Sequence, residues 1–181
     1  QEGSQPNGGP GQNTFTVSGT NYLHINGGYI VIDAGGDGID INGPIEMSGG
    51  VVIVNGPTEN MNGALDYLGS FSMTGGYLIA AGSSGMAQGP STSSTQYSVM
   101  LTLSSVMPAG TMVHIESDEG EEVLTFVPTK AYQSVVFSAS DLQNGATYVV
   151  YTGGSATGTV ADGLSSGGTY TPGTKVTSFT I

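Results

Sequence analysis

The stretch HINGGYIVI, His24–Ile32, recurs as EMSGGVVIV, Glu46–Val54, and again as SMTGGYLIA, Ser72–Ala80. The glycine pairs begin at Gly27, Gly49 and Gly75, so the copies are 22 and then 26 residues apart. A period of this length is typical of solenoids, in which each repeat forms one turn of a stack. Apolar residues alternate on both sides of each glycine pair, which indicates strands. We therefore predict an all-β chain that begins with a short right-handed parallel β-helix of about three turns.

The aligned copies also predict which side chains stack from one turn to the next. The paired glycines fit a tight corner, where a side chain would clash or φ must be positive. An apolar outer face needs a cover, which could be the C-terminal half, a polysaccharide or another copy; we expect cover by protein. The predicted inner ladders are Leu23/Ile45/Phe71, Ile25/Met47/Met73, Ile30/Val52/Leu78 and Ile32/Val54/Ala80, and the outer columns are Tyr29/Val51/Tyr77 and Val31/Ile53/Ile79.

After a linker at 89–96 the pattern changes to short alternating runs separated by turn signals. We expect an antiparallel β-sandwich here, which caps the open sheet edge at the end of the solenoid. The predicted division is a tail or donor strand at 1–20, the β-helix at 21–95 and the sandwich at 96–181. The expected strands are 98–103, 112–116, 123–127, 134–137, 147–151 and 175–181.

The composition excludes several classes of function. Fourteen acidic residues stand against two basic ones, Lys130 and Lys175, for a formal net charge of −12. Such a chain cannot neutralise phosphates, so we expect no nucleic-acid partner. No apolar run is long enough to insert in a membrane. The chain has no cysteine and begins at Gln1 without a signal peptide, which fits a processed extracellular protein.

The segment DAGGDGID contains the acidic residues Asp33, Asp37 and Asp40. Aligning GIDINGPIEM with ALDYLGSFSM places Asp66 level with Asp40 on the next turn. Carboxylates on adjacent turns, about 4.8 Å apart, repel by about 3 kcal/mol at an effective dielectric of about 20. A calcium ion would offset this repulsion; the alternative is a set of solvated turn caps. Nearby oxygen donors are Asn42 and Asn62.

Several segments resemble a bacterial family of extracellular carbohydrate-binding β-helix proteins that are pectate-lyase-like but not catalytic. The resemblance runs through most of residues 21–181, and longer members carry further turns ahead of this region. It implies bound calcium and binding of cellulose or acidic plant polysaccharide. The matching segments are INGGYIVIDAGGDGID (25–40), VIVNGPTENMNGALDY (52–67), LIAAGSSGMAQGPSTSSTQ (78–96), GTMVHIESDEGEEVLTFVPTKAYQSVVFS (110–138) and GGTYTPGTKVTSFTI (167–181).

Three functions remain open on these grounds. We predict a secreted, non-catalytic, calcium-binding protein that binds polysaccharide and self-assembles head-to-tail into a fibre, because a three-turn solenoid with one bare end looks incomplete alone. The alternatives are a monomeric carbohydrate-binding module and, less favoured, a hydrolase or lyase. Residues 1–129 contain neither Lys nor Arg, so a lyase would lack its base. Aromatic faces suit sugar rings, and the candidates are Tyr22, Tyr29, Tyr67 and Tyr77.

The remaining candidate groups have structural interpretations. His24 and His114 both lie in alternating segments, where we expect them to be structural rather than catalytic. The acidic run 116–122 surrounds Gly120 and is predicted to be a solvated hairpin turn.

Overall fold

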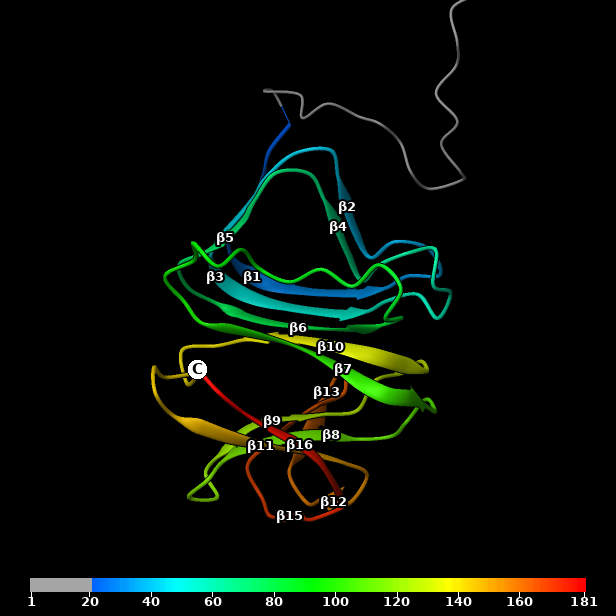
Figure 1. The fold of residues 1–181 in the computed structure, drawn as a ribbon, viewed down its shortest axis with the longest axis vertical. Helices are drawn as coiled ribbons and strands as arrows, with labels where there is room; N and C mark the ends of the chain where they lie inside the picture. Colours follow the sequence, from blue (N-terminus) through cyan, green and yellow to red (C-terminus); the bar gives the residue numbers. More distant parts are fainter. Residues whose placement is uncertain (1–20) are drawn as a thin grey trace, which may run out of the picture.

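The computed structural model describes residues 21–181, and all the regular structure in this range is β-strand (Figure 1). The all-β prediction is confirmed; the expected tail or donor strand at 1–20 lies outside the described residues. The strands are β1 (Leu23–Asp33), β2 (Ile39–Ile41), β3 (Ile45–Asn55), β4 (Leu65–Tyr67), β5 (Phe71–Met73), β6 (Tyr77–Gly82), β7 (Ser98–Met107), β8 (Val113–Ser117), β9 (Glu122–Phe126), β10 (Tyr132–Ser138), β11 (Thr147–Thr152), β12 (Ser155–Ala156), β13 (Thr159–Ala161), β14 (Leu164–Ser166), β15 (Tyr170–Thr171) and β16 (Thr174–Thr180).

The three copies of the repeat stack in parallel. β1 pairs with β3, and β3 pairs in turn with β5 and β6, while β2 pairs with β4 on a second side of the stack. The chain passes through roughly triangular loops between these strands (Figure 1). The register joins Leu23–Ile45–Phe71, Ile25–Met47–Met73, Tyr29–Val51–Tyr77, Ile30–Val52–Leu78, Val31–Ile53–Ile79 and Ile32–Val54–Ala80. Every predicted ladder is therefore confirmed in its register.

The inner ladders form a small core whose burial depends on the turn. Val52 and Leu78, on the second and third turns, are fully buried, whereas Ile30 on the first turn is exposed. The difference arises because, within residues 21–181, nothing stacks on the outer edge of β1. The first turn therefore has the same pattern as the others but lacks a neighbour on one side.

The second glycine of each pair makes the corner between the two halves of a turn. Gly28, Gly50 and Gly76 have φ angles of 91°, 90° and 97°, in the region that favours glycine. The turns also approach closely, since a Cβ on Gly50 would lie 2.7 Å from the carbonyl carbon of Gly27. Both predicted reasons for the glycines are confirmed.

The sheet that contains β1, β3 and β6 continues into the C-terminal half. β10 pairs antiparallel with β6, and β7 pairs antiparallel with β10, so the order is β1-β3-β6-β10-β7. This pairing caps the far edge of the parallel stack, as expected. The second sheet has the order β13-β14-β9-β8-β11-β16 and lies below the first in Figure 1.

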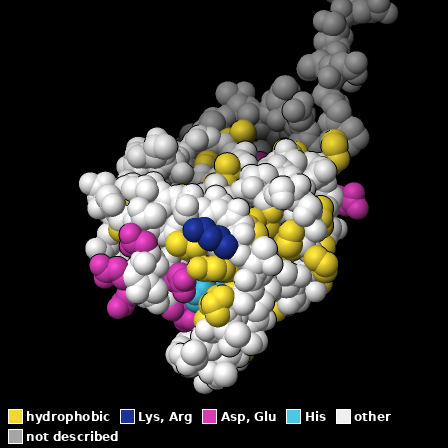
Figure 2. Space-filling model, turned by 60° about the horizontal axis from the view of Figure 1, so that its bottom comes forward, with side chains coloured by type: hydrophobic (Ala, Val, Ile, Leu, Met, Phe, Trp, Pro, Cys, Tyr) yellow, Lys and Arg dark blue, Asp and Glu magenta, His cyan; other side chains and the backbone are white. Residues whose placement is uncertain are grey.

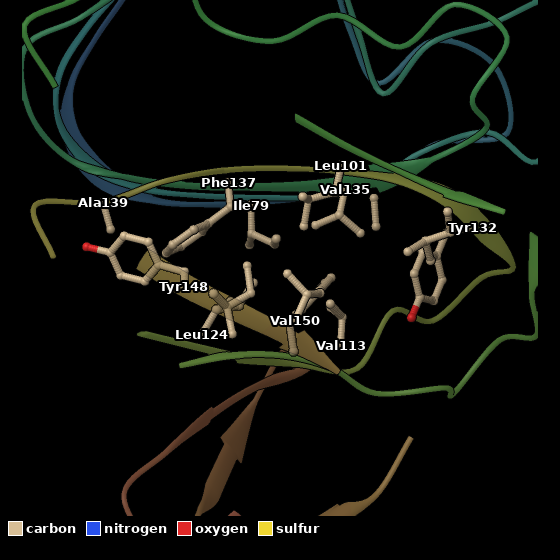
Figure 3. Packing of buried hydrophobic residues seen from close by; sticks show 14 of the residues in the cluster. Ile79, Leu101, Val113, Leu124, Tyr132, Val135, Phe137, Ala139, Tyr148 and Val150 are labelled. Carbon is tan, nitrogen blue, oxygen red and sulfur yellow. The ribbon is translucent and has the colours of Figure 1, made fainter. Parts of the chain in front are cut away.

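The larger core lies between the two sheets. The upper sheet contributes Phe137, Ile79, Leu101 and Val135, whose side chains pack against those of the lower sheet, including Tyr148 (Figure 3). The same cluster contains the outer-column residues Ile53 and Ile79, with Val51 and Tyr77 packed against it. The expected cover of the outer face by protein is therefore confirmed for the second and third turns.

The six predicted C-terminal strands coincide with β7, β8, β9, β10, β11 and β16; their ends agree within two residues, except that β7 continues four residues further. The short strands β12 to β15 were not expected. β7 and β10 join the sheet of the parallel repeats, and one hydrophobic cluster includes residues from both sides of position 95. The division into 21–95 and 96–181 stays a prediction.

Candidate functional site

Two carboxylates face each other where β2 pairs with β4. Asp40 and Asp66 are in register on adjacent parallel strands, as the sequence alignment predicts. Asp37 lies close by, and its Oδ1 accepts a hydrogen bond of 2.7 Å from the backbone N–H of Gly63. Burial raises the pKa of the Asp66 carboxyl, and the charges of Asp37 and Asp40 raise it further. The Asp40–Asp66 pair, which we call the aspartate rung, therefore concentrates negative charge together with Asp37, and the repulsion is unfavourable.

Asp33 has a different environment from the other three aspartates. Its carboxylate forms an ion pair with the Lys130 ammonium and accepts a hydrogen bond of 3.0 Å from the Thr129 hydroxyl. These two hydrogen bonds, the Lys130 one first, hold the pKa of Asp33 below its usual range. The Thr129 N–H also donates to the Asn55 side chain at 2.8 Å. Asp33 and Asn55 thus fasten the loop after β9 to the ends of β1 and β3, respectively.

A cation at the rung would need more than carboxylates. Within residues 21–181 no three His, Cys, Asp or Glu side chains are grouped so that they could hold a metal ion by themselves. Asn42 directly follows β2, and Asn62 precedes the Gly63 amide that binds Asp37; both are half-buried. Calcium accepts amide and backbone carbonyl oxygens as well as carboxylates, so Asp40, Asp66 and these neighbours fit its preference for oxygen.

The four candidate tyrosines divide into two pairs. Tyr22, directly before β1, and Tyr29, within β1, are each about half exposed, at 53% and 51%. The Tyr22 ring stacks on His24 at 5.8 Å, and His24 Nδ1 lies 3.1 Å from Glu46 Oε2. Desolvation raises the pKa of Tyr29, and the Asp162 carboxylate, in the turn between β13 and β14, raises it further. About half of each side chain is open to solvent.

Tyr67 and Tyr77 take part in packing instead. The Tyr67 hydroxyl donates to the Gly89 carbonyl at 2.6 Å, and its ring meets Phe71 edge-on. Tyr77 packs edge-on against Phe137 at 5.3 Å, beside the core between the two sheets. These contacts leave Tyr22 and Tyr29 as the accessible members of the set.

The structure contains a buried polar cluster around His114 that the sequence pattern does not predict. His114 is 1% exposed; its Nδ1 lies 2.7 Å from Thr125 Oγ1 and its Nε2 3.3 Å from Glu116 Oε2. Because the Thr125 hydroxyl donates to Glu122, the Nδ1–H of His114 must be the donor to Thr125. The ring also stacks on Tyr170 at 3.7 Å. Burial lowers the pKa of His114, and the two glutamates partly oppose this shift.

The order Thr125–His114–Glu116 resembles a nucleophile, a base and an orienting acid only in residue type, because the Nδ1 that faces Thr125 carries a proton and cannot accept another. Thr125 is also as deeply buried as His114, and Tyr170 covers the ring, so no substrate reaches the hydroxyl in this conformation. The arrangement fits the structural role expected for His114: it ties β8 to β9 and to the β15 segment.

The charges are distributed unevenly over the surface. The hairpin between β8 and β9 turns at Gly120 and borders a cavity of about 520 Å³, whose lining includes five carboxylates. Figure 2 shows most acidic side chains of this face gathered on one side and hydrophobic side chains exposed on the other. The acidic side would repel a polyanion. The lining carboxylates are Asp118, Glu119, Glu121, Glu122 and Asp141.

Comparisons of the chain with protein-family models, with curated proteins and with solved structures find no match. In the part of the chain that the structure describes, no helix has the length and apolar character needed to span a bilayer.

Proposed function

We propose that this chain is an extracellular, non-catalytic polysaccharide-binding protein, built on a short right-handed parallel β-helix with an antiparallel cap. The three-layer parallel register and the triangular loops support the β-helix. The observation that carries the binding function is the pair of half-exposed tyrosines, Tyr22 and Tyr29, on the first turn. Aromatic faces of this kind stack on the apolar faces of sugar rings.

The charge of the chain limits which polysaccharide it can bind. A net charge of −12 opposes contact with an acidic polysaccharide unless a divalent cation neutralises both sides. Cellulose is uncharged and meets no such barrier. We therefore expect retention on cellulose with or without calcium, and retention on polygalacturonate only with calcium.

Replacing Tyr22 with alanine should weaken cellulose binding about three- to tenfold, because one stacking face contributes roughly 0.5–1.5 kcal/mol. The measurement is a depletion isotherm on insoluble cellulose with protein kept monomeric. Tyr97→Ala is the matched control, since Tyr97 is an exposed tyrosine on the opposite edge of the sheet. Equal losses in both variants would contradict the proposed site, and release of reducing or unsaturated sugars would contradict the non-catalytic function.

Calcium is the cofactor that we propose for the aspartate rung. In chelator, Asp66→Asn should raise the free energy of unfolding by about 1 kcal/mol, since it removes a solvent-screened repulsion from Asp37 and Asp40. With calcium, the wild type should gain thermal stability and Asp66→Asn should gain much less. Calorimetric melting curves with chelator and with calcium measure both effects.

The pH dependence gives an internal check on Asp66. A raised pKa means that the folded state binds this proton more tightly, so the stability due to Asp66 is present at acid pH and is lost as the pH rises through the folded pKa. The gain from Asp66→Asn in chelator should therefore shrink in acid. Asp118→Asn, at the exposed hairpin, is the control. A calcium response unchanged by Asp66→Asn would place the ion elsewhere.

We also propose that copies assemble head-to-tail into a fibre. The supporting observation is the incomplete first turn, where apolar side chains that are buried on the next turns face solvent. A surface of this kind that is complementary to another patch gives an open, heterologous assembly. Electron microscopy of the purified full chain should show filaments; isolated particles at every concentration would favour the monomeric binding module.

A further inference from the structure

Within residues 21–181 the main sheet ends in two strands that have a neighbour on one side only. Among residues 21–181, β1 pairs only with β3 within this sheet, and β7 pairs only with β10. β1 has eleven residues and β7 has ten. Backbone N–H and C=O groups along their outer sides have no strand partner in the described part of the chain, and such groups readily pair with another chain.

The two edge strands run in the same direction. β1, β3 and β6 are parallel, β10 is antiparallel to β6, and β7 is antiparallel to β10. The two reversals cancel, so β7 is parallel to β1. If one copy is shifted along the sheet without being turned over, its β7 meets the β1 of the next copy as a parallel neighbour, as β1 meets β3.

In this arrangement the apolar side chains of β7 in one copy would also align with those of β1 in the next. Following the pairs across the sheet gives one row, Val31–Ile53–Ile79–Phe137–Val99, and a second, Ile32–Val54–Ala80–Val136–Met100. Both rows are apolar from end to end, and both have exposed or half-buried ends, with Val31 43% and Met100 50% exposed. A second copy in the shifted position would continue each row and bury these ends.

The distribution of charge favours the β1 and β7 edges over the rest of the surface as the interface between copies. The chain is strongly acidic, so two copies repel unless they meet through neutral surfaces. No Asp, Glu, Lys or Arg occurs from Tyr67 to Ile115, a range that contains all of β7. A cavity of about 530 Å³ beside β7 is lined only by uncharged side chains. On β1 the charged group Asp33 is paired with Lys130, and the stretch from Asn26 to Ile32 is neutral.

From these features we infer that the β7 edge of one copy pairs in parallel with the β1 edge of the next, with Val99 opposite Val31 and Met100 opposite Ile32. The inference rests on the proposed assembly and specifies its interface and partner: a second copy of this chain. The main sheet would then run unbroken through the fibre. Neither edge strand has a proline or an unpaired charge in its middle that would block such pairing.

Engineered cysteines test the register directly, because the chain has no cysteine of its own. In the double variant Ile32→Cys/Met100→Cys, the two positions within one molecule are four strand spacings apart, about 19 Å. They cannot form a disulfide with each other, whereas paired copies bring them within disulfide range. Mild oxidation of the assembled full chain should produce a ladder of covalent oligomers on a non-reducing gel. A mixture of the two single variants should stop at the dimer.

The controls separate this interface from other routes of assembly. Ile32→Cys/Ser178→Cys carries its second thiol on β16, in the other sheet, and should give no ladder. Filaments without a ladder from Ile32→Cys/Met100→Cys would overturn the β7–β1 pairing and leave the proposed assembly standing. Neither filaments nor a ladder would overturn both.

A deletion of residues 1–20 tests whether the tail occupies the edge instead. The ladder should persist in the double variant that lacks these residues. A ladder that appears only after the deletion would assign the edge to the tail in the full chain and overturn the direct pairing of strands. Circular dichroism of each variant confirms that the β-structure is retained.

Discussion

Phe137→Ala should lower the free energy of unfolding by about 3–5 kcal/mol, the usual cost of removing a fully buried phenylalanine. Phe137 lies on β10, is completely buried and pairs with Ile79 on β6 and Val99 on β7. Its ring meets Tyr77 edge-on and projects into the core between the two sheets (Figure 3). It therefore joins the parallel strands, the antiparallel extension and the core shared with the second sheet.

Because these contacts join both halves, the chain should unfold in one transition and the variant should shift that whole transition. Urea unfolding followed by far-ultraviolet and tyrosine near-ultraviolet circular dichroism measures both quantities. Val106→Ala is the control: Val106 is 60% exposed on β7, and its loss should change stability by about 0.5 kcal/mol or less. Two separate transitions, of which Phe137→Ala moves one, would instead support division near residue 95.

The parallel part of the fold could be predicted because, when repeats stack, residues at equivalent positions of successive repeats become neighbours in space. Once the glycine pairs are aligned, Val31, Ile53 and Ile79 must fall in one column, and the structure has them in register. The Asp40–Asp66 rung follows by the same logic. The strands of the C-terminal half could also be predicted, because the alternation of apolar residues that indicates a strand is a local property of the sequence.

The partners of those C-terminal strands could not be predicted in the same way. β10 alternates like any sandwich strand, and nothing local in it indicates that its neighbour is β6, some fifty residues earlier. The Asp33–Lys130 ion pair joins residues 97 positions apart, so the sequence pattern gives no reason to separate Asp33 from the other aspartates. His114 likewise gains its partners from β9 and the β15 segment, which bring Thr125 and Tyr170 to it.

The glycine pairs allow a graded test of the stacking. Gly50→Ala should destabilise the chain by about 3–4 kcal/mol, since the new Cβ is strained at φ 90° and lies 2.7–2.9 Å from the backbone of Gly27 and Gly28. Gly28→Ala has the same positive φ, but no described atom lies within 4 Å of its Cβ. It should cost only the conformational strain, about 1–2 kcal/mol.

Gly27→Ala completes the series as the matched control. Its φ lies outside the positive region and its Cβ would meet no atom of residues 21–181 within 4 Å, so its stability should stay within about 0.5 kcal/mol of the wild type. Urea unfolding of the three variants should therefore rank them Gly27, Gly28, Gly50 in increasing loss. Equal losses at Gly28 and Gly50 would mean that only the φ angle matters. The close approach of the turns would then contribute nothing to the requirement for glycine.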